Sequence, residues 1–177
     1  LEMSKIEAGR MTIREKSFDL REMLQGLEEM FLLRAEEKHL ALNFDIHEEV
    51  PQFIFTDEGK LRQIIMNLLG NAVKFTEKGG ITLVVGVKHD VISETIDEFE
   101  KKILLQFNVL DTGPGIEEKE LKKIFLPFVQ AENIKNGEGT GLGLSISREY
   151  AELLGGSLSA KSLLGQGSTF TLILPVL

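Results

Sequence analysis

The stretch Gly137–Ile146 reads GEGTGLGLSI, and it decides which kind of fold this chain requires. Its glycines Gly139, Gly141 and Gly143 stand at alternate positions, directly before a pattern that predicts a helix over 142–154. Glycine takes positive φ and admits a close ligand, but each glycine costs conformational entropy on folding. A glycine-rich turn that opens a helix presents free N–H groups and the positive end of the helix dipole, which suits an anion.

Two alternatives bear on this interpretation of the glycine turn. The same pattern also describes a flexible loop before a helix, and taken alone it is weak evidence for a ligand. The known glycine fingerprints do not fit, because no Lys-Ser or Lys-Thr pair follows as in a P-loop and no βαβ unit surrounds the stretch. If the turn binds phosphate, the fold must be a nucleotide-binding fold of another kind.

Composition limits the class of protein. The chain has 177 residues, 42% of them hydrophobic, which is enough for one buried core, so a single globular domain is expected. No apolar run approaches the ~20 residues that a membrane span needs. The absence of cysteine excludes disulfides and thiolate metal sites, and the net charge of -8 argues against a nucleic-acid partner. Because Leu1 is not an initiator residue, we expect the chain to be a piece of a longer protein.

Hydrophobic periodicity predicts a mixed sheet with helices packed on one face. Asp19 is expected to cap the first helix, and Thr56 or Asp57 the second. The polar segment 90–102 is expected to be a surface excursion between two strands. The expected helices cover 19–38, 57–75, 117–124 and 142–154, and the expected strands cover 13–18, 40–46, 53–55, 81–88, 103–110, 157–161 and 168–174.

Polar residues mark one edge of the helix expected over 57–75. Asn67, Asn71 and Lys74 are four and three residues apart, so their side chains fall on one stripe beside the apolar face. They are compatible with an ordinary solvated helix edge, but asparagine is a poor helix former and Gly70 weakens the same helix further. Amide oxygens suit a hydrated Mg²⁺ that also binds phosphate oxygens, and Lys74 would then lie where the phosphates are.

A second polar position ends the strand expected over 103–110. Asp111 has the same parity as the apolar residues of that strand, so its carboxylate is expected on the core side, where the chain turns through Thr112–Gly115. An ordinary turn, in which Asp111 accepts from the backbone two residues on, explains the residue equally well. The alternative donor is a purine amino group, with Gly113 and Gly115 letting a flat ring approach the backbone.

Five stretches together resemble the N, G1, F, G2 and G3 boxes of sensor histidine kinases, in the family's order. These stretches are NLLGNAVKFT at 67–76, DTGPGI at 111–116, FLPFVQ at 125–130, GTGLGLSI at 139–146 and GQGSTF at 165–170. The resemblance covers about residues 15–177. The first residues, LEMSKIEAGRM, resemble the end of a dimerisation hairpin, so 1–12 would be its remnant and 13–177 the catalytic domain. The sequence FVQAE at 128–132 is similar to that of hybrid kinases.

The resemblance implies an ATP-binding domain of the Bergerat type, shared with gyrase, the MutL repair proteins and Hsp90. Its expected fold is an α/β (α+β) two-layer sandwich, with a mixed, mainly antiparallel sheet of about five strands and about three helices on one face. It implies that Asn71 ligates Mg²⁺ with Asn67 beside it, and that Lys74 reaches the phosphates. Asp111 would accept from the adenine amino group, with Thr169 supporting it through water. A lid over about 126–138 would be hinged at Phe125 and Phe128. The other residues expected to line the site are Phe75, Gly113, Gly115, Ile116, Gly139, Thr140, Gly141, Leu142, Gly143 and Leu144.

The reaction implied is transfer of the γ-phosphoryl group of ATP to a histidine, which asks for positioning and charge neutralisation. None of His39, His47 and His89 fits the family's acceptor motif, so we expect the chain to bind Mg²⁺-ATP without phosphorylating itself. One alternative is an ATPase of the gyrase and Hsp90 group, disfavoured because Asn67 stands where those enzymes have a glutamate base. The other alternative is a module that only binds nucleotide.

The resemblance also implies partners and a location. The expected partners are ATP, the histidine hairpin of the same kinase and the receiver domain of a response regulator. The fragment itself is expected to be a monomer, because dimerisation would belong to the hairpin of the dimeric full-length kinase. The domain is expected in the cytoplasm, where ATP is, in a parent protein that is either cytoplasmic or anchored in the inner membrane.

Overall fold

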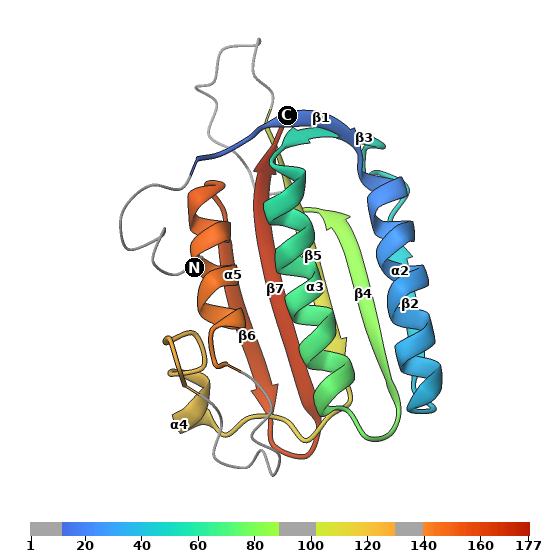
Figure 1. The fold of residues 1–177 in the computed structure, drawn as a ribbon, viewed down its shortest axis with the longest axis vertical. Coiled ribbons are helices and arrows are strands. Elements are labelled where there is room, and N and C mark those ends of the chain that lie inside the picture. The colour runs from blue at the N-terminus through green and yellow to red at the C-terminus, as the bar shows by residue number, and fades with distance from the viewer. Residues whose placement is uncertain (1–11, 89–101, 130–139) are drawn as a thin grey trace.

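A five-stranded sheet carries three helices on one of its faces (Figure 1). This computed structural model describes residues 12–88, 102–129 and 140–177. The strand order is β2-β4-β5-β7-β6, in which β2 and β4 run parallel and all other neighbours run antiparallel. The predicted two-layer sandwich is therefore confirmed. The strands are β2 (Ala41–Ile46), β4 (Gly80–Val87), β5 (Ile103–Asp111), β6 (Ser157–Leu163) and β7 (Gly167–Val176).

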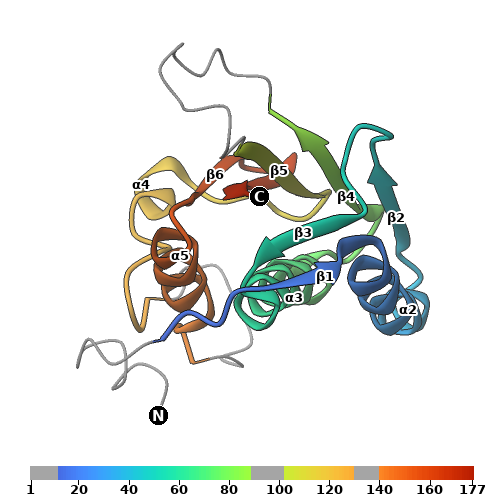
Figure 2. The same ribbon diagram turned by 90° about the horizontal axis from the view of Figure 1, so that it is seen from above.

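The helical layer consists of α2 (Leu20–Glu37), α3 (Glu58–Phe75) and α5 (Gly143–Leu153), and Figure 2 shows all three on the same side of the sheet. A short helix, α4 (Glu118–Leu121), lies against β6. It is a single turn, shorter than the 117–124 expected, because the residues after Leu121 continue as tight turns. Among the described residues, no helix is long and apolar enough to cross a membrane.

The core forms between α3 and the middle of the sheet. Alternate residues of each central strand are buried on the helix side, as period-two patterning requires, and α3 buries every residue of its apolar face. The buried residues that meet there include Leu61, Ile64, Leu68 and Ala72 of α3, Leu105, Phe107 and Val109 of β5, and Phe170, Leu172 and Leu174 of β7.

A separate two-stranded ribbon crosses one end of the sandwich, near the C terminus at the top of Figure 1. It pairs β1 (Lys16–Asp19) antiparallel with β3 (Phe53–Thr56), and the Phe55 N–H donates to the Leu177 carbonyl at 2.9 Å. Periodicity predicts both strands, but it does not reveal that they pair only with each other, apart from the five-stranded sheet. The first strand is also shorter than the expected 13–18 and ends one residue later.

Three predicted features fall wholly or mostly outside the described residues. They are the hairpin remnant 1–12, of which the structure describes Thr12 alone, the polar excursion 90–102, and the part of the lid from 130 to 138. These remain expectations from the sequence.

Aspartates begin both long helices. Asp19 accepts from the Glu22 N–H at 2.9 Å at the start of α2, as predicted, and Asp57 accepts from the Lys60 N–H at 3.0 Å at the start of α3. Of the two caps considered for α3, the structure therefore selects Asp57 over Thr56. Each side-chain oxygen satisfies one of the N–H groups that a helix start leaves without an intrahelical partner.

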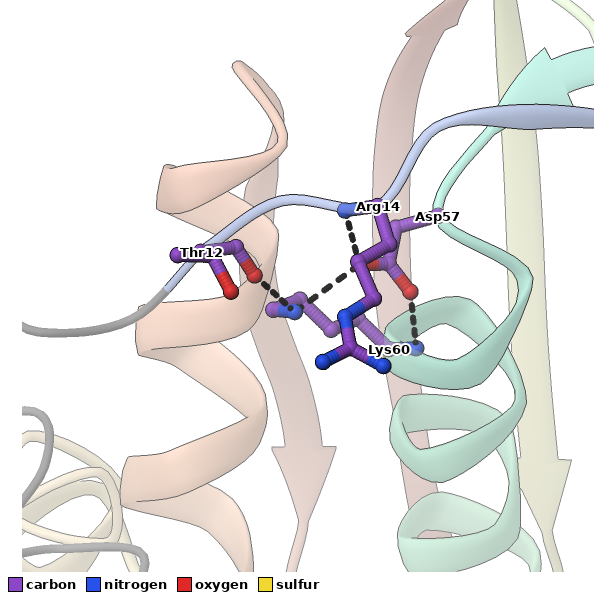
Figure 3. Close-up of polar contacts among 4 residues, drawn as sticks. All are labelled: Thr12, Arg14, Asp57 and Lys60. Carbon is purple, nitrogen blue, oxygen red and sulfur yellow. Dashed lines mark hydrogen bonds and ion pairs between the residues drawn. The ribbon is translucent and has the colours of Figure 1, made fainter.

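Asp57 also ties the incoming chain to α3 (Figure 3). Its Oδ2 accepts from Lys60 Nζ and from the Arg14 N–H, both at 2.8 Å, and the same Nζ donates to the Thr12 carbonyl at 2.9 Å. The side chain of Asp57 is only 7% exposed and that of Lys60 only 14%. Burial alone would raise the pKa of Asp57, but the hydrogen bonds from Lys60 and Arg14 outweigh it and lower the pKa. Lys60 further lies 5.7 Å from the ring of Tyr150 on α5.

We expect Asp57→Ala to lower the free energy of unfolding by about 2–4 kcal/mol, because it removes the cap and leaves the Lys60 charge buried without its partner. Asp57→Asn keeps a capping oxygen and should cost less. Since the folded pKa lies below 3.8, the carboxylate stabilises the fold above that pH and loses its contribution as the pH falls through the folded value. Urea unfolding of the three proteins from pH 7 downward measures this. A wild-type advantage over Asp57→Asn that persists undiminished in acid would contradict it.

Candidate nucleotide site

The polar edge of α3 faces the start of α5, where the glycine turn ends. Asn67 Nδ2 donates to the Gly143 carbonyl at 3.2 Å and to Ser147 Oγ at 2.9 Å, while its Oδ1 accepts from Gln63 Nε2 at 3.3 Å. Asn67 therefore holds the beginning of α5 against α3. A neutral amide engaged in this way does not take up a proton, so Asn67 is a positioning residue in this geometry.

Asn71 and Lys74 continue the same edge toward the end of α3. Asn71 is half-buried and its amide has no hydrogen bond to any of the described residues, while Lys74 is exposed with Nζ 5.2 Å from the Phe75 ring centre. In the described ranges, no group of three or more His, Cys, Asp or Glu side chains is placed to hold a metal. The amide oxygen of Asn71 is a hard donor that would fit a hydrated Mg²⁺, which takes its other ligands from water and phosphate.

Asp111 ends β5 on the face that the helices cover. Its Oδ1 accepts from the Gly113 N–H at 2.9 Å, so the turn expected as the ordinary explanation is present. The other expectation holds too, because the side chain shares the parity of the buried Val109 and Phe107. Burial raises the pKa of Asp111, and the N–H groups of Gly113 and Ser168 only partly oppose it. A carboxylate in this state gains from one further donor.

Thr169 is not placed as expected. It pairs with Leu110, whereas Asp111 pairs with Ser168, and directly paired residues point to the same face of a sheet. Ser168 therefore lies beside Asp111 on the helix side, and Thr169 lies on the opposite face. Ser168 also breaks the apolar run of buried alternate residues along β7, a signal in the sequence that identifies it without the structure.

The turn after Asp111 packs by its backbone on the β6–β7 hairpin. Gly115 has φ +72°, and a Cβ there would lie 2.1 Å from the Leu163 carbonyl oxygen. The Ile116 N–H donates to Ser162 Oγ at 2.8 Å, and the same hydroxyl lies 2.9 Å from Ser168 Oγ. Side-chain atoms would separate these backbones, so Gly115 is required by a close approach and by its φ together.

The phenylalanine segment, residues 125–128, contacts the glycine turn. The Phe128 N–H donates to the Gly141 carbonyl at 3.0 Å, and a Cβ on Gly141, whose φ is +67°, would lie 2.9 Å from Phe128 Cα. Phe128 itself has φ +62° and is 72% exposed. Phe125 is half-buried, with its ring edge-on to Phe170 at 6.4 Å between centres. Gly139, expected in this turn, lies outside the described residues.

The sequence predicts an anion site at the start of α5. Its N-cap residue is Leu142, which has no side chain that accepts from the first turn, and the half-buried Leu144 packs against the core. Thr140 is exposed and its hydroxyl oxygen is 3.4 Å from the Leu142 N–H, a marginal contact. Among the described residues, no side chain caps this helix start, and Asn67 of α3 lies against it, so the helix end suited to an anion lies beside the polar edge of α3.

A family model described as histidine kinase-, DNA gyrase B-, and HSP90-like ATPase matches residues 56–177. The chain belongs to this family, and within it to the ATP-binding catalytic domains of two-component sensor histidine kinases. The resemblance of the five sequence stretches is thereby confirmed.

Relatives and solved structures agree with this assignment. The autoinducer 2 sensor kinase/phosphatase LuxQ of Vibrio vulnificus is 38% identical over 182 residues, covering 99% of this chain and 20% of LuxQ. The aerobic respiration control sensor ArcB of Escherichia coli is 35% identical over 175 residues, covering 97% of this chain and 21% of ArcB. The chain thus spans about a fifth of these two relatives.

Two solved structures are similar in fold. Full-length ShkA in complex with AMPPNP superposes with a TM-score of 0.79 at 33% identity, covering 98% of this chain and 33% of ShkA. The catalytic domain of the histidine kinase ThkA superposes with a TM-score of 0.68 at 24% identity, covering 92% of this chain and 97% of that domain. At 24% identity, the similarity to the ThkA domain shows a shared fold.

Gly115→Ala should lower the free energy of unfolding by about 2–5 kcal/mol, because a positive φ and a collision with Leu163 add together. Gly165→Ala is the matched control. Gly165 has φ +78° in the neighbouring hairpin, but no atom lies within 4 Å of its would-be Cβ, so only the backbone cost of about 1–2 kcal/mol is expected. Equal losses in urea unfolding would show that the close approach contributes nothing.

Asp111→Asn should leave the unliganded fold as stable as the wild type at neutral pH, or more stable. The pKa of Asp111 in the folded protein lies above its ordinary value of 3.8. The protonated carboxyl group therefore stabilises the fold at pH values below 3.8, and this contribution is lost as the pH rises through the folded pKa. Denaturant unfolding of both proteins across that range tests the sign. A wild-type advantage that grows with pH would contradict the burial of the carboxylate.

Proposed function

We propose that this domain binds Mg²⁺-ATP and transfers the γ-phosphoryl group to a histidine carried by a helical hairpin elsewhere in the parent protein. The observation that carries the proposal is the pairing of the Asn67–Lys74 edge with the start of α5. This pairing brings the α3 edge, with its amide oxygens and the Lys74 ammonium group, to the side of a helix start, and phosphate binding uses groups of these kinds. Asp111 supplies a separate hydrogen-bond acceptor for the amino group of the adenine ring.

Each residue has a defined part in this proposal. Asn71 would offer its amide oxygen to Mg²⁺, and Lys74 would lie against the phosphate oxygens. When bound, Mg²⁺ neutralises charge that develops on the transferred phosphoryl group. Asn67 keeps α5 in place, so the helix start stays aimed at the phosphates. Asp111 would accept from the amino group of adenine, and Ser168 rather than Thr169 is the neighbour suited to assist it.

The acceptor histidine is expected outside this chain. His47 is exposed and follows β2, at the opposite edge of the sheet from β6. His39 is exposed just after α2 with φ +56°, while His89 lies outside the described residues. A hydrolytic activity is less well supported, because the position of a water-activating glutamate is taken by Asn67, whose amide is engaged with α5.

Further partners belong to the same proposal. A receiver domain would take the phosphoryl group from the histidine, in keeping with relatives that include a hybrid signal transduction histidine kinase of Dictyostelium discoideum. We propose that the domain alone is a monomer, that the hairpin of the parent kinase makes the dimer, and that this domain works in the cytoplasm.

The decisive experiment follows γ-labelled ATP with Mg²⁺, using the chain alone and then with a separately made histidine hairpin from a related kinase. We expect acid-labile label on the hairpin and little free phosphate. Asn71→Ala should reduce labelling roughly 100-fold or more, since it removes the metal ligand, while Asn43→Ala on the exposed side of β2 should not. Free phosphate from the chain alone would favour the ATPase alternative, and tight ATP binding with neither product would favour a binding module.

Nucleotide affinity gives a second test of the same site. Asp111→Asn places an NH₂ donor where the carboxylate offers only acceptors, so ATP affinity should fall about 10- to 100-fold. Its unfolding measured in parallel separates loss of binding from loss of structure. Unchanged affinity would remove Asp111 from the base site.

A further inference from the structure

One buried hydroxyl is left without a partner beside the proposed base site. Thr76 is 0% exposed, and among the described residues its Oγ1 is the one buried side-chain polar atom that makes no hydrogen bond. A hydroxyl buried in this way costs free energy, and native proteins retain such groups mainly where water or a ligand completes them.

The backbone of Thr76 is fully engaged, so the position of its side chain is fixed. Its N–H donates to the Ala72 carbonyl at 3.0 Å and ends α3. Its carbonyl accepts from Lys38 Nζ at 2.9 Å, and the same ammonium group also binds the Val73 and Lys74 carbonyls. A threonine at a helix end commonly satisfies its hydroxyl on a nearby backbone carbonyl, but Thr76 does not.

The hydroxyl lies near the Asp111 carboxylate, with the buried Gly113 beside both groups. A Cβ added to Gly113 would lie 2.7 Å from Asp111 Oδ1 and 3.3 Å from Thr76 Oγ1. The absence of a side chain at Gly113 therefore lets one acceptor and one group that both donates and accepts lie close together. Nothing in the motif pattern distinguishes this threonine from a helix terminator, so only the tertiary contact reveals it.

We infer that Thr76 is a second base-recognition residue. The Asp111 carboxylate accepts from the exocyclic amino group of a 6-aminopurine, and the Thr76 hydroxyl donates, directly or through one buried water, to the adjacent ring nitrogen N1. This inference rests on the proposed function, because it requires that the site takes ATP. A 6-oxopurine presents an oxygen to the carboxylate in place of the amino group, so the same pair disfavours GTP.

The test uses the isosteric variant Thr76→Val, with Thr76→Ser as the control that keeps the hydroxyl. Removing an unsatisfied hydroxyl should leave the unliganded protein as stable as the wild type or more stable in urea unfolding. ATP affinity, measured by calorimetry, should fall about tenfold in Thr76→Val and less than about threefold in Thr76→Ser.

A nucleotide that lacks N1 separates base recognition from a structural role, because a structural role would not change the ratio of the affinities for ATP and for this nucleotide. The wild type should bind 1-deaza-ATP about tenfold more weakly than ATP, whereas Thr76→Val should bind the two equally. The inference is overturned if Thr76→Val keeps full ATP affinity, or if its affinities for both nucleotides fall by the same factor. Failure of the wild type to bind ATP at all would refute the proposed function, and the inference with it.

Discussion

The burial of the apolar face of α3 against β5 and β7 is the constraint on which the rest of the structure depends. With about 100° between successive residues, burying Leu61, Ile64 and Leu68 fixes the rotation of the whole helix. The edge that carries Asn67 and Asn71 must then face α5. Because of that rotation, Asn67 reaches Gly143 and Ser147, so the core sets how the start of α5 is held against α3.

The loops of the site are joined to one another largely by backbone contacts. Gly115 packs on the β6–β7 hairpin, Gly141 on the phenylalanine segment, and Gly113 under Asp111 and Thr76. Two polar groups inside this frame are unfavourable for the fold: a carboxylate with a raised pKa, and a hydroxyl to which the described residues offer no hydrogen bond. Binding sites characteristically hold such groups, because a ligand completes what the protein leaves unsatisfied.

Particular residues show how far sequence reasoning reached. The long helices and their aspartate caps were predictable because periodicity and capping are local, and the Asp111 face followed from strand parity. The G3 stretch predicts Thr169 as the residue that supports Asp111, but strand pairing places Ser168 beside Asp111, because the face of a strand residue depends on the register of the sheet. The pairing of β1 with β3 and the single turn of α4 were also beyond local pattern, because strand partners and helix ends depend on contacts far away in the chain.

The sequence by itself determined the layer architecture, the family and most of the candidate site, because apolar periodicity and five ordered stretches with special glycines are properties of short segments. The tertiary structure alone decided which polar atoms meet. Asn67 bridges 76 residues to Gly143, and Thr76 comes beside Gly113 only when α3 packs on the end of β5. The physical reason is that a hydrogen bond depends on distances of a few ångström between atoms, and only the folded packing of distant segments sets those distances.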